Sequence, residues 1–348
     1  MNKRKFILQP ETGTLSEEDA KRYFSTVGLA VAALVVLFQG ANFALSWLIY
    51  RVNPALLDNV WVSNLLSFIP LYCVAFPVFY LILRRLPRDR VTPEKLGAKN
   101  TLGGLCVAVV LMMVGSYVAN ILVMLFESVT GRTLVNPVES ATAGNAWWIN
   151  LIFMAILAPI LEELVFRKVL CDRLLPLGEG YAVLLSGAVF GLTHGNFYQF
   201  FYAFLLGALF ALIYVKTGRI RYSVFYHALI NLVGGVFMSW VMEKVEPLME
   251  TETLNALMEA LMAYDTATVL EIAGPALIPL MLLSLYESLL MVASVFGVIF
   301  MIKARRRLRL AEGLLPPPKE GRVAMLFCNV GVAAALTVYA ALFILSLL

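Results

Sequence analysis

The sequence predicts an all-α fold: a polytopic membrane helix bundle of about eight or nine transmembrane helices that encloses a polar cavity within the membrane. Of the 348 residues, 61% are hydrophobic and 14% are charged, which is more apolar surface than a soluble domain of this length can bury. The apolar residues are gathered in runs of about 20, the length that crosses a bilayer as a helix. Ionisable residues inside these runs fall in spaced motifs, and ionisable residues at membrane depth are candidates for function.

Nine apolar runs are candidate spans. They cover residues 27–50, 61–83, 102–126, 146–166, 181–194, 197–215, 224–242, 273–302 and 323–348. The fifth run is short for a complete crossing. The predicted count is therefore eight without this run and nine with it.

The basic residues test this count independently, because the cytoplasmic loops of membrane proteins are enriched in Lys and Arg. When nine spans are threaded from a cytoplasmic N-terminus, all but three of the 27 basic residues fall on the cytoplasmic side; the exceptions are Arg51, Arg132 and Lys244. The cytoplasmic group includes Lys3, Arg4 and Lys5 near the N-terminus and Arg167, Lys168 and Arg173 after the fourth span. The net charge of +4 therefore reflects orientation in a membrane and does not indicate nucleic-acid binding.

We accordingly expect a multi-pass protein of the cell membrane with a cytoplasmic N-terminus. The segments outside the spans are short, which suits a bacterial plasma membrane, and the endoplasmic reticulum is the alternative. Membrane lipid is then the first partner of the chain, because it surrounds the spans.

The spans divide the chain into five regions. Residues 1–26 form a cytoplasmic N-terminal segment, 27–145 the N-terminal transmembrane helices, 146–242 the core helices that carry the motifs, 243–272 an acidic outer loop, and 273–348 the C-terminal transmembrane helices. Ser16, three residues before Asp19, predicts the start of a helix. In the outer loop, the spacing of Leu254, Leu257, Met258 and Leu261 predicts an amphipathic helix, which lies on the membrane interface or is a solvated loop helix.

Two further features indicate packing more than chemistry. The four cysteines are scattered without paired spacing, so we expect reduced packing residues and neither a disulfide framework nor a thiol nucleophile. Glu287 stands alone in the eighth span, and we expect it to bridge helices or to line a cavity.

The first motif is Glu162-Glu163-x3-Arg167 in the fourth span. Adjacent residues on a helix point about 100° apart, so the two carboxylates must have different partners. Glu163 and Arg167 are four residues apart on one face, which predicts an ion pair between them. Glu162 then remains free to face a cavity. A carboxylate that is partly removed from water exchanges protons nearer neutrality, which is the condition for a general base.

The second and third motifs contain both histidines of the chain, as Phe190-x3-His194 and His227-x3-Asn231. His227 and Asn231 project from one helix face and offer N–H donors to a developing oxyanion, where removing one donor costs roughly 3 kcal/mol. His194 is placed to orient a water that Glu162 activates, with Phe190 packed one turn below. A water activator combined with an oxyanion hole is what peptide-bond hydrolysis needs when water itself is the nucleophile.

These three motifs, in this order on successive helices, resemble those of the CAAX protease and bacteriocin-processing family, which includes the CAAX prenyl endopeptidases. The resemblance covers residues 146–242 and extends to the Thr217-Gly218-x-Ile220 turn before His227. It implies a glutamate-dependent intramembrane endopeptidase without a cofactor, acting on a membrane-associated or lipidated peptide. It also implies the same roles for the four residues: Glu162 as the base, His194 as its water-positioning partner, and His227 with Asn231 as the oxyanion stabilisers.

Other functions remain open at this point. Glu162, His194 and His227 could instead bind zinc, since two histidines and a carboxylate form many catalytic zinc sites. The sequence has no His-Glu-x2-His helix and no carboxylate beside either histidine, and both features would have supported zinc binding. A non-enzymatic immunity factor or partner-binding protein would keep the fold without turnover, but a degenerate member should have lost a motif residue and none is lost. A transporter would require repeated halves, which the sequence lacks.

The positions of the motifs within their spans also predict how deep the site lies in the membrane. Glu162, His227 and Asn231 fall within about three turns of the cytoplasmic ends of their predicted spans, about 12 Å by helical rise. We therefore expect the cavity to open toward the cytoplasmic half of the membrane. Gly187, Gly191 and Gly195 are expected to permit close helix packing and tilt around His194.

Overall fold

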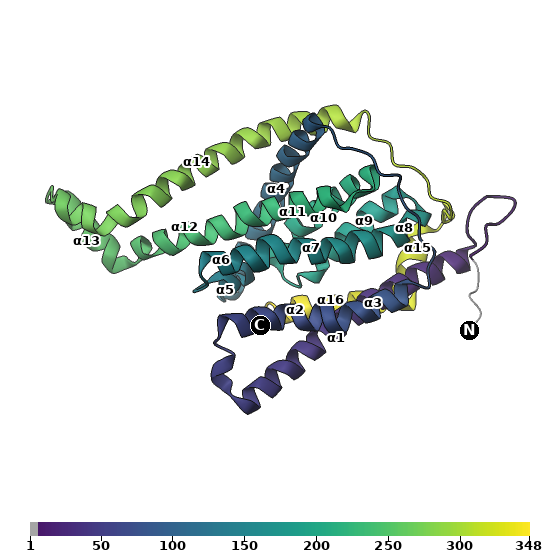
Figure 1. The fold of residues 1–348 in the computed structure, drawn as a ribbon, viewed down its shortest axis with the longest axis horizontal. Coiled ribbons are helices and arrows are strands. Elements are labelled where there is room, and N and C mark those ends of the chain that lie inside the picture. Colours follow the sequence, from purple (N-terminus) through teal and green to yellow (C-terminus); the bar gives the residue numbers. More distant parts are fainter. Residues whose placement is uncertain (1–5) are drawn as a thin grey trace.

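The computed structural model of the chain describes residues 6–348, and over this range its regular structure is helical (Figure 1). Seven helices are long and apolar enough to cross a membrane, and two shorter apolar helices accompany them. The long ones are Glu17–Val52, Val60–Leu83, Ala98–Thr130, Trp147–Leu177, Phe197–Thr217, Ile220–Met249 and Thr266–Arg305; the shorter ones are Glu179–Thr193 and Val330–Leu345. The predicted all-α membrane bundle is confirmed. Lys3, Arg4 and Lys5 lie outside the described residues.

Several of these helices consist of shorter segments. Before the motifs, the elements are α1 (Glu17–Val52), η1 (Pro54–Leu56), α2 (Val60–Ile69), the π-helix η2 (Pro70–Ala75), α3 (Phe76–Leu83), α4 (Ala98–Thr130) and α5 (Pro137–Thr142). The helix of the first motif is α6 (Trp147–Asn150), the π-helix η3 (Leu151–Leu157), α7 (Ala158–Glu163), the π-helix η4 (Leu164–Cys171), α8 (Asp172–Leu174) and η5 (Leu175–Leu177).

The second half of the chain continues the bundle. Its elements are α9 (Glu179–Thr193), α10 (Phe197–Thr217), α11 (Ile220–Asn231), the π-helix η6 (Leu232–Phe237), α12 (Met238–Val245), η7 (Glu246–Met249), α13 (Thr251–Met262), α14 (Thr266–Arg305), α15 (Arg322–Phe327) and α16 (Val330–Leu345). The predicted amphipathic loop segment is α13. As predicted, Ser16 caps α1, its side chain accepting a hydrogen bond from the backbone N–H of Asp19.

The centre of the bundle is α10, which packs against α9 on one side and α4 on the other. The predicted close packing is confirmed for two of the three glycines: a Cβ on Gly187 would lie 2.7 Å from the backbone nitrogen of Ala208, and one on Gly191 would lie 2.9 Å from the carbonyl oxygen of Phe200, whereas one on Gly195 would meet only the Leu342 side chain, at 3.5 Å. These helices therefore approach at backbone distance. Around the centre, α1 packs against α3 and α16, and α14 packs against α4.

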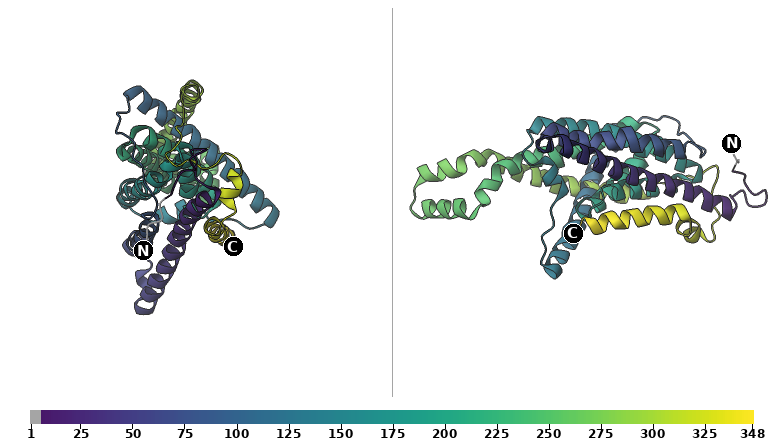
Figure 2. Two further views of the ribbon diagram at one scale, coloured as in Figure 1. Left: turned by 90° about the vertical axis from the view of Figure 1, so that its right-hand side faces the viewer. Right: turned by 90° about the horizontal axis from the view of Figure 1, so that it is seen from below.

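The two ends of the bundle differ in charge. The end that we call the basic end carries residues 84–97, 216–221 and 303–309. The opposite end, the acidic end, carries α5, α12 and α13, with Glu139, Glu243, Glu246, Glu250, Glu252 and Glu259. On this side α12, α13 and the adjoining part of α14 project beyond the rest of the bundle (Figures 1 and 2).

Two predicted span limits were wrong. The fourth helix was expected to end at residue 166 but continues to Leu177, so Arg167, Lys168 and Arg173 are helical and do not lie in a loop. Arg167 and Arg173 are buried, and protein groups satisfy both: Arg173 donates to the carbonyl oxygens of Leu83 and Val169. A charge that is neutralised inside a bundle does not end a helix.

The last predicted span, 323–348, is also interrupted. It breaks between α15 and α16, where the Asn329 side chain caps the new helix by accepting from the backbone N–H of Val332. Glu287 lies exposed on α14, which does not support the expected helix-bridging or cavity-lining role. Cys171 is buried, whereas Cys73 and Cys328 are exposed, and all four cysteines are free.

Candidate active site

Helices α7, α9 and α11 bring the three motifs together in the middle of the bundle. Glu162 and Glu163 end α7, His194 caps the C-terminus of α9, and His227 and Asn231 lie on α11. Glu162 is midway between Trp147 and Leu177, which places it roughly 20 Å from either end of its helix by helical rise. The expected depth of about 12 Å from the basic end was therefore wrong for Glu162, because the helix extends further than predicted.

The predicted ion pair between Glu163 and Arg167 is present. Nε of Arg167 lies 2.9 Å from Oε2 of Glu163, a second guanidinium nitrogen lies 3.3 Å from Oε1, and both side chains are fully buried. The remaining guanidinium nitrogen donates to the hydroxyl of Ser186, which in turn donates to the carbonyl oxygen of Phe166. Ser186 is also fully buried. Nothing in its sequence context singled it out.

His227 lies between the two glutamates, which the sequence did not predict. Its Nδ1 lies 3.2 Å from Oε1 of Glu163, and its Nε2 lies 3.7 Å from Oε2 of Glu162. Because a carboxylate can only accept, the contact with Glu163 fixes the Nδ1 proton and directs Nε2 toward Glu162. The Glu162 side chain keeps 23% of its surface exposed, against 0% for Glu163. Glu162 is therefore the carboxylate that a reactant can reach.

Aromatic side chains hold both imidazoles. The Phe190 ring packs edge-on against His194 at 5.2 Å and against His227 at 5.4 Å between ring centroids. On its other side His227 stacks on Phe210 at 5.3 Å. Nδ1 of His194 lies 2.9 Å from the carbonyl oxygen of Phe190; a carbonyl accepts, so Nε2 of His194 is left as an acceptor. Phe190 thus connects the second and third motifs, and Phe210 was not predicted.

Asn231 links α11 to the helix of the first motif. Its side-chain amide donates to the carbonyl oxygen of Met154 at 2.9 Å. Met154 belongs to η3, a π-helical segment, and the helices that carry the motifs contain two more, η4 and η6. Short π-helical segments are frequent at functional sites, because the widened turn displaces backbone groups from the regular pattern. One of the two amide hydrogens of Asn231 is occupied, and the other remains for a ligand.

The zinc alternative requires Glu162, His194 and His227 to converge on one point. Within residues 6–348, no group of three His, Cys, Asp or Glu side chains is arranged to hold a metal ion. Each histidine directs Nδ1 at a protein oxygen, which leaves Nε2 free, and Phe190 packs against both rings. Histidines that bind zinc also donate their second ring N–H to a protein oxygen, so these two bonds are compatible with either alternative.

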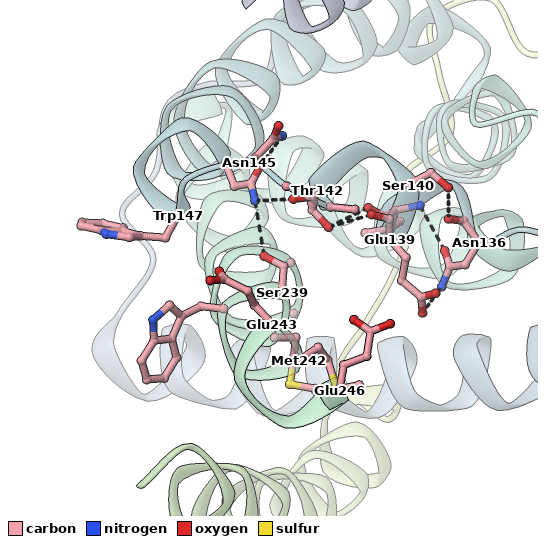
Figure 3. Close-up of a pocket in the computed structure, with 18 of the residues that line it drawn as sticks. Asn136, Glu139, Ser140, Thr142, Asn145, Trp147, Ser239, Met242, Glu243 and Glu246 are labelled. Carbon is pink, nitrogen blue, oxygen red and sulfur yellow. Dashed lines mark hydrogen bonds between the residues drawn. The ribbon is translucent and has the colours of Figure 1, made fainter. Parts of the chain in front are cut away.

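A cavity of about 990 Å³ lies at the acidic end, and none of the predicted site residues lines it (Figure 3). Asn150, Gly234 and Gly235 line it, and Asn150 hydrogen-bonds Ser239 across it. The basic end is covered instead: residues 172–177 are all buried, and residues 309–315 lie across them with backbone bonds from Leu315 to Pro176 and from Glu179 to Ala311. The cavity around Glu162 was expected to open toward the basic end, which this segment covers.

Known proteins resemble the part of the chain that carries the site. The family model for type II CAAX prenyl endopeptidase Rce1-like proteins matches residues 144–233. YdiL of Bacillus subtilis (strain 168), which by its name is classed with membrane peptidases, is 27% identical over 161 residues, or 44% of this chain and 64% of that protein. The membrane-embedded CAAX protease MroQ of Staphylococcus aureus (strain USA300) is 34% identical over 90 residues, or 24% of this chain and 36% of that protein.

The chain thus covers less than two thirds of the length of either relative. No solved structure matches it significantly. The matched segment contains every predicted site residue, from Glu162, Glu163 and Arg167 through Phe190 and His194 to His227 and Asn231. Residues 144–233 therefore match the Rce1-like CAAX prenyl endopeptidases, the family that the three motifs resemble.

Proposed function

We propose that the protein is an intramembrane endopeptidase in which Glu162 activates a water that hydrolyses a peptide bond. One observation carries the proposal: His227 is held by the buried Glu163–Arg167 pair and directs its other nitrogen at Glu162, the accessible carboxylate. Glu162 is then a proton acceptor that lies beside the imidazole of His227, and Glu163 orients this imidazole. Such an arrangement is expected of general acid–base catalysis. The match of residues 144–233 to the Rce1-like family model, and the names of the two relatives, support the activity.

The proposed reaction starts with a water bound beside Glu162. The carboxylate takes one proton from this water while the oxygen attacks the carbonyl carbon of the peptide bond, giving a tetrahedral oxyanion. The carbon–nitrogen bond then breaks, and Glu162 returns the proton to the leaving amine. Atoms and charge balance without a covalent intermediate on the protein.

The other polar residues divide the remaining tasks. His194 presents an unprotonated Nε2, so it can accept the second hydrogen of the water and orient it. Asn231 has one amide hydrogen left for the oxyanion. His227 adds an Nε2–H donor when its ring carries both protons, with Glu163 accepting the Nδ1 proton. Such preorganised donors are where most of the rate acceleration in acyl transfer arises.

We propose that this chemistry proceeds without a metal. The support is geometric, because no group of three His, Cys, Asp or Glu side chains within residues 6–348 is arranged to hold a metal ion. A glutamate base fits the observed pairing, because Arg167 neutralises Glu163 and leaves the carboxylate of Glu162 without a guanidinium partner.

The proposed substrate is a membrane-associated or lipidated peptide. The site lies in the middle third of an apolar helix, so a cleaved segment must itself be apolar or be anchored near the membrane. The basic end is proposed to face the cytoplasm, as positively charged loops usually do, which places the acidic end and its cavity on the opposite side.

The test compares Glu162→Gln with the parent protein. Purified protein in vesicles is given peptides from the host membrane, and Glu162→Gln is expected to lose turnover by about 10²–10⁴-fold while it retains bound peptides that mass spectrometry can identify. Equal turnover in the two proteins would refute the role of Glu162. Peptides that the parent holds intact would indicate the non-enzymatic, partner-binding alternative.

The same preparation tests the metal. We expect less than one metal ion per chain and activity that resists chelators. Stoichiometric zinc, with activity that chelation removes and zinc restores, would replace the glutamate mechanism by the zinc alternative.

A further inference from the structure

The cavity at the acidic end has a lining of one charge. Four carboxylates contribute to it, from Glu139, Glu243, Glu246 and Glu250, and no Lys, Arg or His side chain does. The remaining lining combines small polar residues with Trp147, Trp240, Met238, Met242 and Met249. Figure 3 shows Glu139 on one wall, opposite Glu243 and Glu246. A cleft lined by one sign of charge focuses the electrostatic field and raises the local concentration of the opposite charge.

These carboxylates are weakly paired. Glu139 accepts a hydrogen bond from Asn136 at 2.9 Å, which leaves its charge in place. Glu243 contacts the neighbouring Lys244 at 2.7 Å, but the two side chains are 56% and 44% exposed. Such an exposed pair is worth less than about 1 kcal/mol. Glu246 and Glu250 have no ion pair among residues 6–348, so most of the negative charge is available to a ligand.

The cavity adjoins the proposed catalytic centre. Gly235 lines it and lies one helical turn beyond Asn231, and a Cβ at Gly235 would meet the side-chain methyl of Met154 at 3.0 Å. Met154 is the residue whose carbonyl oxygen accepts the bond from Asn231. Met154 therefore lies close to Gly235 through its side chain and to Asn231 through its carbonyl oxygen, whereas the basic end is covered by residues 309–315.

We propose that this cavity is a vestibule for the positively charged flank of the peptide substrate, whose adjoining apolar segment reaches Glu162 past Met154. The inference rests on the proposed endopeptidase function and adds the charge of the substrate and the end from which it approaches. The Met and Trp side chains of the lining suit the aliphatic stems of Lys and Arg, and Trp faces attract their charged groups. The carboxylates around the opening complement the charge itself.

The experiment measures binding separately from cleavage. The probe is a synthetic fluorescent peptide with a leucine-rich segment followed by four lysines, compared with the same peptide carrying glutamines instead. Both are titrated into vesicles of neutral phosphatidylcholine that contain the Glu162→Gln protein. We expect the lysine peptide to bind at least tenfold more tightly, with an advantage that shrinks as salt is added.

Neutralising the opening should remove this preference. The triple variant Glu243→Gln, Glu246→Gln, Glu250→Gln, in the Glu162→Gln background, is expected to bind the lysine peptide about tenfold more weakly and the glutamine peptide unchanged. The matched control is Glu252→Gln with Glu259→Gln, which removes charge from α13 outside the cavity lining. Equal effects of the two sets of substitutions, or no preference for lysine in the starting protein, would overturn the vestibule.

Cleavage of the same peptides by protein with Glu162 intact separates the two proposals. Tight, charge-dependent binding without any cleavage would leave the vestibule standing and count against the endopeptidase. Cleavage of the lysine and glutamine peptides at equal rates would support the endopeptidase and count against the vestibule.

Discussion

The glutamates of this chain lie in two contrasting settings. In the core, Glu163 is fully buried and contacts both Arg167 and His227. At the acidic end, Glu243, Glu246 and Glu250 are exposed and contact little. Burial of a charge is tolerated only with a partner and hydrogen bonds, whereas water or headgroups solvate an exposed one. The same residue type is therefore fixed in position in the core and free to meet a ligand at the surface.

The largest expected loss of stability comes from removing the charge of the buried carboxylate. Glu163→Gln leaves the guanidinium of Arg167 buried without its counter-charge, which should lower the free energy of unfolding by about 3–5 kcal/mol. The exposed counterpart, Glu246→Gln, should change it by no more than about 0.5 kcal/mol. Thermal unfolding in detergent, followed by size-exclusion chromatography, compares the two.

A double substitution tests whether the loss of stability comes from the unpaired charge of Arg167. Glu163→Leu with Arg167→Met removes both charges, and replacing a whole buried pair by apolar residues is often neutral. Stability should recover toward that of the parent, but turnover should not, because His227 has lost the acceptor of its Nδ1 proton. Equal losses of stability in Glu163→Gln and Glu246→Gln would show that the two settings do not differ as described.

An intermediate effect is expected at Ser186. Its hydroxyl bridges Arg167 and the carbonyl oxygen of Phe166, so Ser186→Ala leaves a buried donor unsatisfied at a cost of about 1–3 kcal/mol. Ser223 is the matched control, because it is equally buried and bonds only to Ile220 in its own helix. If Ser223→Ala destabilised the protein as much as Ser186→Ala in the same unfolding assay, the bridge to Arg167 would have no special importance.

The smallest perturbation tests which end faces the cytoplasm. In a protein whose four cysteines are replaced, single cysteines at Thr251 on α13 and at Glu312 near the basic end should differ in labelling by an impermeant maleimide. Thr251→Cys should react in intact cells, and Glu312→Cys only after permeabilisation. The reverse pattern would place the cavity at the cytoplasmic end and exchange the sides assigned to the two ends.

The sequence predicts best what depends on local spacing. The pair of Glu163 with Arg167 follows from four-residue spacing on one helix, and the seven long apolar helices follow from hydropathy. Contacts between helices are different, because they depend on how each helix is rotated. The position of His227 between two glutamates, and the contact of Ser186 with Arg167, join segments far apart in the chain.

The two errors have the same origin. Arg167 and Arg173 marked the end of the fourth span in the sequence, but buried partners neutralise them and the helix continues. The direction of the cavity was inferred from distances to helix ends. Residues 309–315, from a distant part of the chain, cover residues 172–177 at the basic end instead.

The π-helical segments have a consequence for how the length of this chain can vary. A π-helical turn accommodates one residue more than an α-helical turn, so losing one residue from η3 would leave a continuous α-helix. The helix on either side of η3 would keep its rotation, because the wide turn had absorbed the extra residue, so Asn150 would still face Ser239. Glu162, Glu163 and Arg167 lie beyond the deletion and would keep their spacing. The carbonyl oxygen of Met154, which accepts from Asn231, would instead return to the regular helical pattern. A change of one residue in η3 is therefore a route by which relatives can alter the partner of Asn231 while the carboxylate pair stays intact.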